Sequence, residues 1–197
     1  MPFVGLTGGI GAGKSTALAA LERLGAAVLS TDEVVHELYQ SDDIRAAVVA
    51  RWGDEVAPTG EVDRTALAAR VFRSEDDRRW LEQLLWPRVG QRVADWRAEI
   101  ERHAPPPPAA VVEVPLLFEA GMEEGFDATV AVVAPEEVRA RRASGRGHES
   151  LDERGARQLT QAQKSQRATY TVSNDASIAD LEARLSAILE NLRTTTR

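Results

Sequence analysis

The sequence predicts an α/β fold: a doubly wound, mostly parallel five-stranded sheet with a helical insertion. Apolar runs rich in β-branched residues alternate along the chain with segments of helical periodicity. Runs without polar alternation are typical of parallel strands that are covered on both faces. Of the 197 residues, 43% are hydrophobic and 28% are charged. This balance is enough to bury a core and excludes a mainly disordered chain.

The N-terminal region predicts a strand, a glycine-rich loop, a helix and a second strand. Residues 3–7 form a short apolar run that ends at glycines. Residues 15–24 place three leucines on one helical face, so we expect a helix there. Gly25 then ends the helix, and residues 26–29 predict the second strand.

A long helical pattern follows, from about residue 33 to residue 102. One apolar stripe within it is formed by Trp80, Leu81, Leu84 and Leu85. Residues 105–108 are all proline and predict a stiff turn that ends the insertion. We expect core positions, rather than base-stacking platforms, for Trp52, Trp80, Trp86 and Trp96.

Three further strands and a closing helix complete the predicted fold. Residues 109–114 and 128–133 are continuous β-rich runs, and residues 170–173 are a weaker one. Ser177, with Asp180 three residues later, matches a capping box before the apolar stripe of the last helix.

Composition excludes several classes of function. The chain has no Cys, so a disulfide framework, a thiol nucleophile and a cysteine zinc site are excluded. Its net charge of -7 disfavours nucleic acid as a partner. The sequence has no apolar run long enough to span a membrane, and its N-terminus lacks the regions of a signal peptide. We therefore expect a cytoplasmic protein with no membrane partner.

The glycine-rich loop carries the clearest chemical motif, G-x-x-x-x-G-K-S, between a predicted strand and a predicted helix. Backbone amides of such a loop can bind phosphate, Lys14 can reach the β- and γ-phosphates, and the Ser15 hydroxyl can bind Mg²⁺. The phosphate loop, as we call it, consists of Gly8, Gly9, Ile10, Gly11, Ala12, Gly13, Lys14, Ser15 and Thr16. A dinucleotide-binding motif is excluded because Lys14 stands where a third glycine is required.

Two acidic residues lie at the carboxyl ends of predicted strands, at the sheet edge that carries this loop. Asp32 could accept a proton from an attacking hydroxyl, or it could cap the helix that starts near Glu33. Glu113 could meet Mg²⁺ or its water, or it could simply be the polar end of a strand. The sequence leaves both alternatives open.

Residues 137–167 are unusually basic, with eight basic and four acidic side chains. Such a segment suits a lid whose arginines close over transferring phosphates, or a solvated arginine-rich helix face. Three histidines have no partner at metal-ligand spacing and are expected to be ordinary surface or packing residues: His36, His103 and His148.

The sequence resembles the dephospho-CoA kinase family over nearly its whole length. The resemblance rests on the phosphate loop motif, on Asp32, and on residues 62–67 with 71–72. It continues through V-P-L-L-F-E at residues 114–119, Arg142, residues 154–158 and Asn174-Asp175. The order and spacing of these segments are much more specific than the phosphate loop alone.

The resemblance implies a P-loop kinase fold and transfer of the ATP γ-phosphate to the ribose 3′-hydroxyl of dephospho-CoA. It implies a nucleotide-binding core (residues 1–34, 109–137 and 168–197), a helical substrate domain (35–108) and a lid (138–167). ATP and dephospho-CoA are the implied substrates and Mg²⁺ the cofactor, in a monomer or weak homo-oligomer. Asp32 is the implied base, Arg142 and Arg146 serve the lid, and Asn174 joins the nucleotide site.

The chain departs from the family pattern at four places. Ser30 and Ala176 stand at positions where the family usually has Asp and Gly. Trp86, before Pro87, replaces the usual His, and Arg139 stands where Gln is commoner. Two other functions stay open from the residues alone. These are another small-metabolite kinase, of nucleotide or shikimate type, and a nucleotide-binding regulatory module without turnover.

Overall fold

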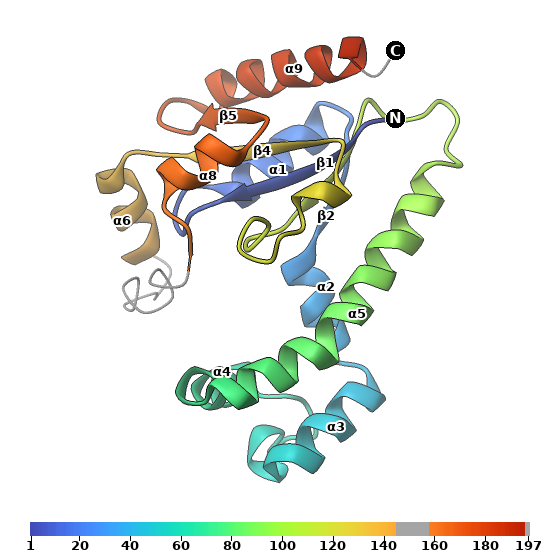
Figure 1. Cartoon of the computed structure of the whole chain (residues 1–197), viewed down its shortest axis with the longest axis vertical. Coiled ribbons are helices and arrows are strands. Elements are labelled where there is room, and N and C mark those ends of the chain that lie inside the picture. The colour runs from blue at the N-terminus through green and yellow to red at the C-terminus, as the bar shows by residue number, and fades with distance from the viewer. Residues whose placement is uncertain (145–157, 196–197) are drawn as a thin grey trace. The chain divides into compact units, whose positions relative to one another are not determined.

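The computed structural model describes residues 1–144 and 158–195. Its strands form one sheet with the order β2-β3-β1-β4-β5, in which every neighbouring pair is parallel (Figure 1). The strands are β1 (Phe3–Gly8), β2 (Ala27–Ser30), β3 (Ala110–Glu113), β4 (Ala128–Val133) and β5 (Tyr170–Ser173). Each end lies within one residue of the predicted position. The predicted five-stranded parallel sheet is therefore confirmed.

Helices fill most of the remaining described chain. They are α1 (Lys14–Arg23), α2 (Thr31–Leu38), α3 (Asp42–Trp52), α4 (Arg64–Arg73), α5 (Glu75–Ile100), α6 (Glu136–Ser144), α8 (Gln161–Arg167) and α9 (Ile178–Thr195), with short 3₁₀ turns η1 (Asp54–Val56) and η2 (Glu123–Gly125). The chain divides into two compact units. Unit 1 is Met1–Ser30 with Arg97–Arg197, and unit 2 is Thr31–Trp96.

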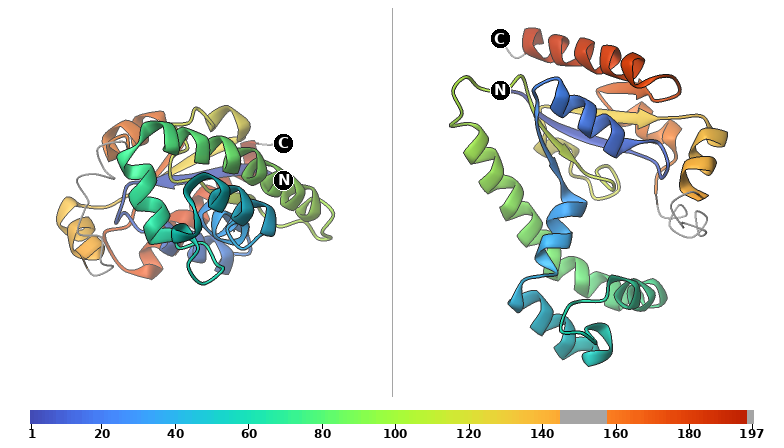
Figure 2. Two further views of the ribbon diagram at one scale, coloured as in Figure 1. Left: turned by 90° about the horizontal axis from the view of Figure 1, so that it is seen from below. Right: turned by 180° about the vertical axis from the view of Figure 1, so that it is seen from behind.

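One face of the unit 1 sheet is covered by α1 and α9 (Figure 2). Val4 and Leu6 of β1 alternate with residues that face the other side, and both belong to the main core cluster. Leucines of the two helices complete it: Leu18, Leu21, Leu181, Leu185 and Leu192. Each fully buried leucine contributes roughly 1.5–3 kcal/mol, so this layer fixes β1 and the start of α1.

The predicted capping box at the start of α9 is confirmed. The amide of Asp180 donates to Ser177 Oγ at 3.1 Å, and the amide of Ser177 donates to Asp180 Oδ2 at 3.1 Å. This reciprocal pair satisfies two backbone donors that have no partner within the helix.

Aromatic side chains pack at the N-terminal edge of unit 1. The rings of Phe3 and Phe126 stack with centroids 4.8 Å apart. The guanidinium carbon of Arg97, near the end of α5, lies 4.4 Å from the centroid of the Phe3 ring. A cation in this position is attracted by the ring face.

Unit 2 has its own core between α3, η1, α4 and α5. It is formed by Ile44, Val48, Val56, Leu67, Leu81 and Leu85, with Trp52, Trp80 and Leu84 partly buried against it. The expected core position of Trp86 is wrong, because this residue is 54% exposed. Leu81, Leu85 and Val89 form the buried stripe of α5, and Trp86 lies about 100° around the helix from Leu85.

No helix within residues 1–144 and 158–195 combines the length and apolar character needed to cross a membrane.

Candidate active site

The phosphate loop leaves the carboxyl end of β1 at Gly8 and enters α1 at Lys14, so the predicted strand, loop and helix are in place. Its turn is closed by the amide of Ala12, which donates to the Gly9 carbonyl at 3.1 Å. Gly11 (φ 74°) and Gly13 (φ 91°) have left-handed backbone conformations that other residues rarely adopt. The motif glycines therefore make this curvature possible.

The start of α1 presents backbone donors at the end of this loop. The amide of Ala17 donates to the Gly13 carbonyl at 3.0 Å, so the amides of residues 14–16 precede the first bond of the helix. Together with the helix dipole they favour an anion. Lys14 is half-buried at the first turn and Ser15 is exposed there.

The outer surface of the loop is packed tightly by two segments that are distant in sequence. A Cβ atom on Gly11 would lie 2.5 Å from the carbonyl oxygen of Arg139, and one on Gly13 would lie 2.0 Å from Nδ2 of Asn174. Both distances are too short for non-bonded atoms. Gly11 and Gly13 are therefore required by close packing as well as by their backbone angles.

Glu113 is the last residue of β3 and is only 6% exposed. In the parallel register it lies beside Leu6 of β1 on one side and Ser30 of β2 on the other. Since the carboxyl ends of parallel strands share one edge, Glu113 and the phosphate loop lie at the same edge of the sheet.

Asp32 belongs to unit 2 and lies in the first turn of α2, which begins at Thr31. The helix therefore starts earlier than the expected position near Glu33, and Asp32 is inside it rather than before it. Its carboxylate is exposed, two residues beyond the end of β2. A negative charge in a first turn is stabilised by the helix dipole.

Among the predicted lid arginines, Arg142 lies against the phosphate loop. Its Nη1 donates to the carbonyl oxygens of Asn174 at 3.2 Å and Ala12 at 3.5 Å. Asn174 is 5% exposed, and its Nδ2 also donates to the Ala12 carbonyl, at 3.0 Å. Arg146 and His148 lie outside the described residues.

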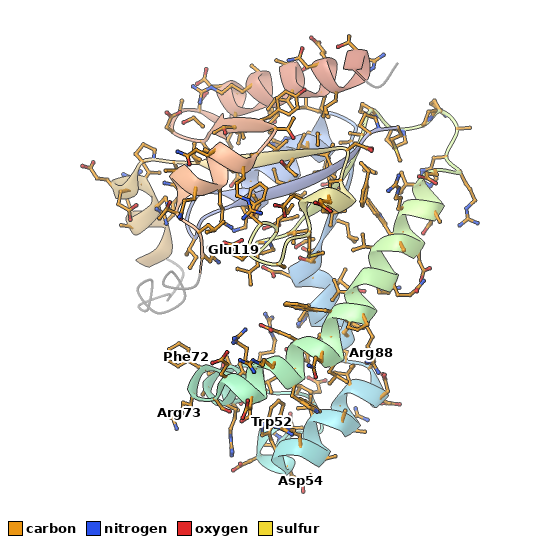
Figure 3. All side chains as sticks on the ribbon, viewed as in Figure 1. Trp52, Asp54, Phe72, Arg73, Arg88 and Glu119 are labelled. Atoms are coloured by element: carbon orange, nitrogen blue, oxygen red, sulfur yellow. The ribbon has the colours of Figure 1, made fainter. Side chains whose placement is uncertain are left out.

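A buried lysine beneath this edge was not assigned a role from the sequence. Lys164 of α8 is fully buried, and its Nζ lies 3.0 Å from Oε1 of Glu119. It also donates to the Pro115 carbonyl at 2.7 Å and to the hydroxyl of Thr7 at 3.3 Å. Figure 3 marks Glu119 in the segment that follows β3.

This lysine joins three segments of unit 1. Burial lowers the pKa of the Lys164 ammonium, the Glu119 carboxylate opposes that shift, and the charge of Lys14 adds to it. Glu119 Oε1 also accepts a hydrogen bond from the Leu159 amide at 2.8 Å. The only sequence signal was that Lys164 is one of two lysines in a chain whose other basic residues are arginines.

Glu119→Gln is expected to lower the free energy of unfolding by about 3 kcal/mol, because it leaves the buried ammonium without its counter-charge. Urea titration measures this change. The control is Glu101→Gln, which removes an exposed ion pair with Arg97 and should cost less than about 1 kcal/mol. A loss at Glu119 no larger than that of the control would contradict a structural role for the pair.

Comparison with known proteins identifies the family of this chain. The family model described as "CoaE: Dephospho-CoA kinase" matches residues 2–180. A dephospho-CoA kinase of Moorella thermoacetica is 38% identical over 190 residues, covering 95% of this chain and 89% of the relative. The chain spans nearly the whole length of that protein.

Two solved structures are similar to this chain over nearly its whole length. The crystal structure of TT1252 from Thermus thermophilus is 34% identical, with a TM-score of 0.79 and coverage of 97% of this chain and 98% of that one. A dephospho-CoA kinase from Campylobacter jejuni has the same fold, with a TM-score of 0.69 at 21% identity and 98% coverage of both chains. From its sequence, this chain belongs to the dephospho-CoA kinase family.

Proposed function

We propose that this chain transfers the γ-phosphate of ATP to the ribose 3′-hydroxyl of dephospho-CoA, forming coenzyme A and ADP. The observation that carries the proposal is family membership over residues 2–180 together with a phosphate loop in a strand–loop–helix setting. A regulatory module without turnover would not need a proton acceptor such as Asp32, which follows β2.

In this proposal the phosphate loop binds the ATP phosphates. Amides of the loop and of the start of α1 donate to phosphate oxygens, and the ammonium of Lys14 neutralises charge that develops during transfer. Asp32 accepts the proton of the attacking 3′-hydroxyl as the new O–P bond forms and the bond to ADP breaks. Arg142 and Arg146 stabilise the transferring group, and Asn174 supports the nucleotide site.

The residues present fit a magnesium ion. Ser15 and Glu113 offer a hydroxyl and a carboxylate, the hard oxygen donors that Mg²⁺ prefers. In kinases one or two protein oxygens usually suffice, because phosphate oxygens and water supply the rest. When bound, the ion would neutralise phosphate charge.

We also propose which parts of the chain bind each substrate. Residues 1–34, 109–137 and 168–197 would form the nucleotide-binding core, residues 35–108 the substrate domain and residues 138–167 the lid. The compact helical unit, Thr31–Trp96, begins four residues earlier and ends twelve residues earlier than the substrate domain of this scheme. We propose a cytoplasmic location and a monomer or weak homo-oligomer.

The test is a coupled assay of ADP formation with ATP, Mg²⁺ and a panel of acceptors. We expect turnover with dephospho-CoA and none above background with shikimate, gluconate or nucleoside monophosphates. Folded protein that binds ATP but phosphorylates another acceptor, and not dephospho-CoA, would overturn the assignment.

Arg142→Ala is expected to lower kcat about 10- to 100-fold, the value of a hydrogen bond made by a charged group. Affinity for ATP should change less, because a lid arginine acts mainly on the closed, reacting complex. Steady-state kinetics and ATP titration measure the two effects, with the neighbouring exposed residue changed in Arg141→Ala as control. Weaker ATP binding with kcat preserved would assign Arg142 to ground-state binding.

A further inference from the structure

Side chains of Arg139, Asn174 and, more weakly, Arg142 donate to carbonyl groups of the phosphate loop from its outer side. Nε of Arg139, in α6, donates to the Ile10 carbonyl at 2.9 Å. Nδ2 of Asn174, just after β5, donates to the Ala12 carbonyl at 3.0 Å. Both elements lie at the end of the sheet where β1 terminates (Figure 1). The loop is thus held at two alternate peptide groups.

These bonds determine where the neighbouring amides point. In a trans peptide the C=O and the N–H point in opposite directions. When Arg139 holds the Ile10 carbonyl outward, the amide of Gly11 is directed away from Arg139. In the same way, when Asn174 holds the Ala12 carbonyl, the amide of Gly13 is directed away from Asn174.

Glycine makes such a hold necessary. Gly11 and Gly13 have no Cβ to restrict rotation of the adjoining peptide groups, so a free loop would sample other orientations of these amides. Ordering them at the moment of ligand binding would cost conformational entropy, about 1–2 kcal/mol per residue. Groups that fix the orientation beforehand reduce that cost.

Arg139 is itself held in place for this task. Its side chain is 19% exposed, and Nη1 forms an ion pair with Oε2 of Glu136 at 2.5 Å, one turn earlier in α6. A Cβ on Gly9 would lie 3.3 Å from Nη2 of Arg139, so the guanidinium also covers that part of the loop. The residue therefore contacts the loop over several consecutive positions.

We propose that Arg139 is a positioning residue, which holds the phosphate loop in its phosphate-binding conformation through the Ile10 carbonyl. Asn174 does the same at Ala12. The inference rests on the proposed use of this loop for the ATP phosphates. It predicts a loss of affinity that depends on the β-phosphate, since the phosphate loop addresses the β- and γ-phosphates rather than the nucleoside.

The experiment compares Arg139→Met with Arg139→Gln. Nε of arginine and Nε2 of glutamine are both bonded to Cδ, so glutamine keeps a donor at the same place and loses the charge. Methionine keeps a similar stem and loses the donor. Titration calorimetry of AMP and ADP, without acceptor, measures the affinity of each variant. Arg141→Met, on the same helix, is the control.

We expect Arg139→Met to weaken ADP binding about tenfold and AMP binding less than twofold, with Arg139→Gln within about threefold of the parent. Amide exchange at Gly11 should be faster in Arg139→Met than in the parent. Unchanged ADP affinity in Arg139→Met, an equal loss for AMP and ADP, or Arg139→Gln as weak as Arg139→Met would each overturn the proposal.

The outcomes separate this inference from the proposed function. Because the titrations contain no acceptor, a kinase with a different acceptor would still give the expected pattern. A parent protein that binds ADP no more tightly than AMP would instead overturn the proposed role of the phosphate loop, and this inference with it.

Discussion

Asp32→Asn is expected to lower kcat by roughly 10² to 10³ while the fold stays intact. Asparagine keeps nearly the same volume and an oxygen that accepts a hydrogen bond, but it cannot take a proton. The loss should fall in this range because phosphoryl transfer has a loose transition state, in which the hydroxyl need not lose its proton early. Single-turnover transfer at saturating ATP and dephospho-CoA measures the effect.

The melting temperature of Asp32→Asn distinguishes a role as catalytic base from a role in stabilising α2. Losing one charge in the first turn of α2 costs about 0.3–1 kcal/mol, so the melting temperature should stay within about three degrees of the parent. Glu33→Gln is the matched control, since Glu33 is the next exposed acid of the same turn. Undiminished transfer in Asp32→Asn would remove this residue from the mechanism, as would equal losses in both variants.

Lys14→Ala should lower kcat by about 10² to 10³, the usual cost of removing one donor to charge that develops in the transition state. The side chain begins α1, where alanine is well tolerated. Steady-state kinetics at saturating substrates measures the loss, and circular dichroism confirms that the helices remain.

The control for Lys14 is Arg23→Ala, at the other end of α1. Arg23 pairs with Glu182 at 2.6 Å in an exposed ion pair, which is worth about 0–1 kcal/mol and is distant from the phosphate loop. Its kcat should match that of the parent. Activity of Lys14→Ala within a factor of about three of the parent would mean that the phosphate loop is not the catalytic phosphate site.

The central strands of the sheet were predictable because β1, β3 and β4 are buried on both faces. Residues 128–133 are an unbroken β-rich run in the sequence, and the structure has β4 there, with Ala131 and Val132 fully buried. The weak pattern at residues 170–173 also forms a strand, because pairing with β4 supports it. The capping box of Ser177 with Asp180 was predictable because it acts locally, whereas Asp32 is not the cap that its position suggested, since α2 begins at Thr31.

Trp86 could not be placed from its residue type. The helical pattern of α5 is mixed, and the buried stripe is set by the partners in α3 and α4 rather than by hydrophobicity alone. A large apolar side chain one residue beyond Leu85 points to a different side of the helix.

The phosphate loop was predictable because the residues that bind phosphate are consecutive in the sequence. Arg139, Glu119 and Lys164 were not, because their partners are distant in sequence: the Arg139–Ile10 bond spans 129 residues and the Lys164–Glu119 pair spans 45. Every residue has a main-chain carbonyl, so a contact to one does not require a particular residue type. No sequence motif therefore reveals such contacts.

The most direct test locates the transferred phosphate. Phosphorus NMR of a reaction with ATP, Mg²⁺ and dephospho-CoA should show one new phosphomonoester, identical to the 3′-phosphate of authentic coenzyme A and equal in amount to the ADP formed. ADP without a new monoester, or a monoester at another position of the acceptor, would contradict the proposed reaction.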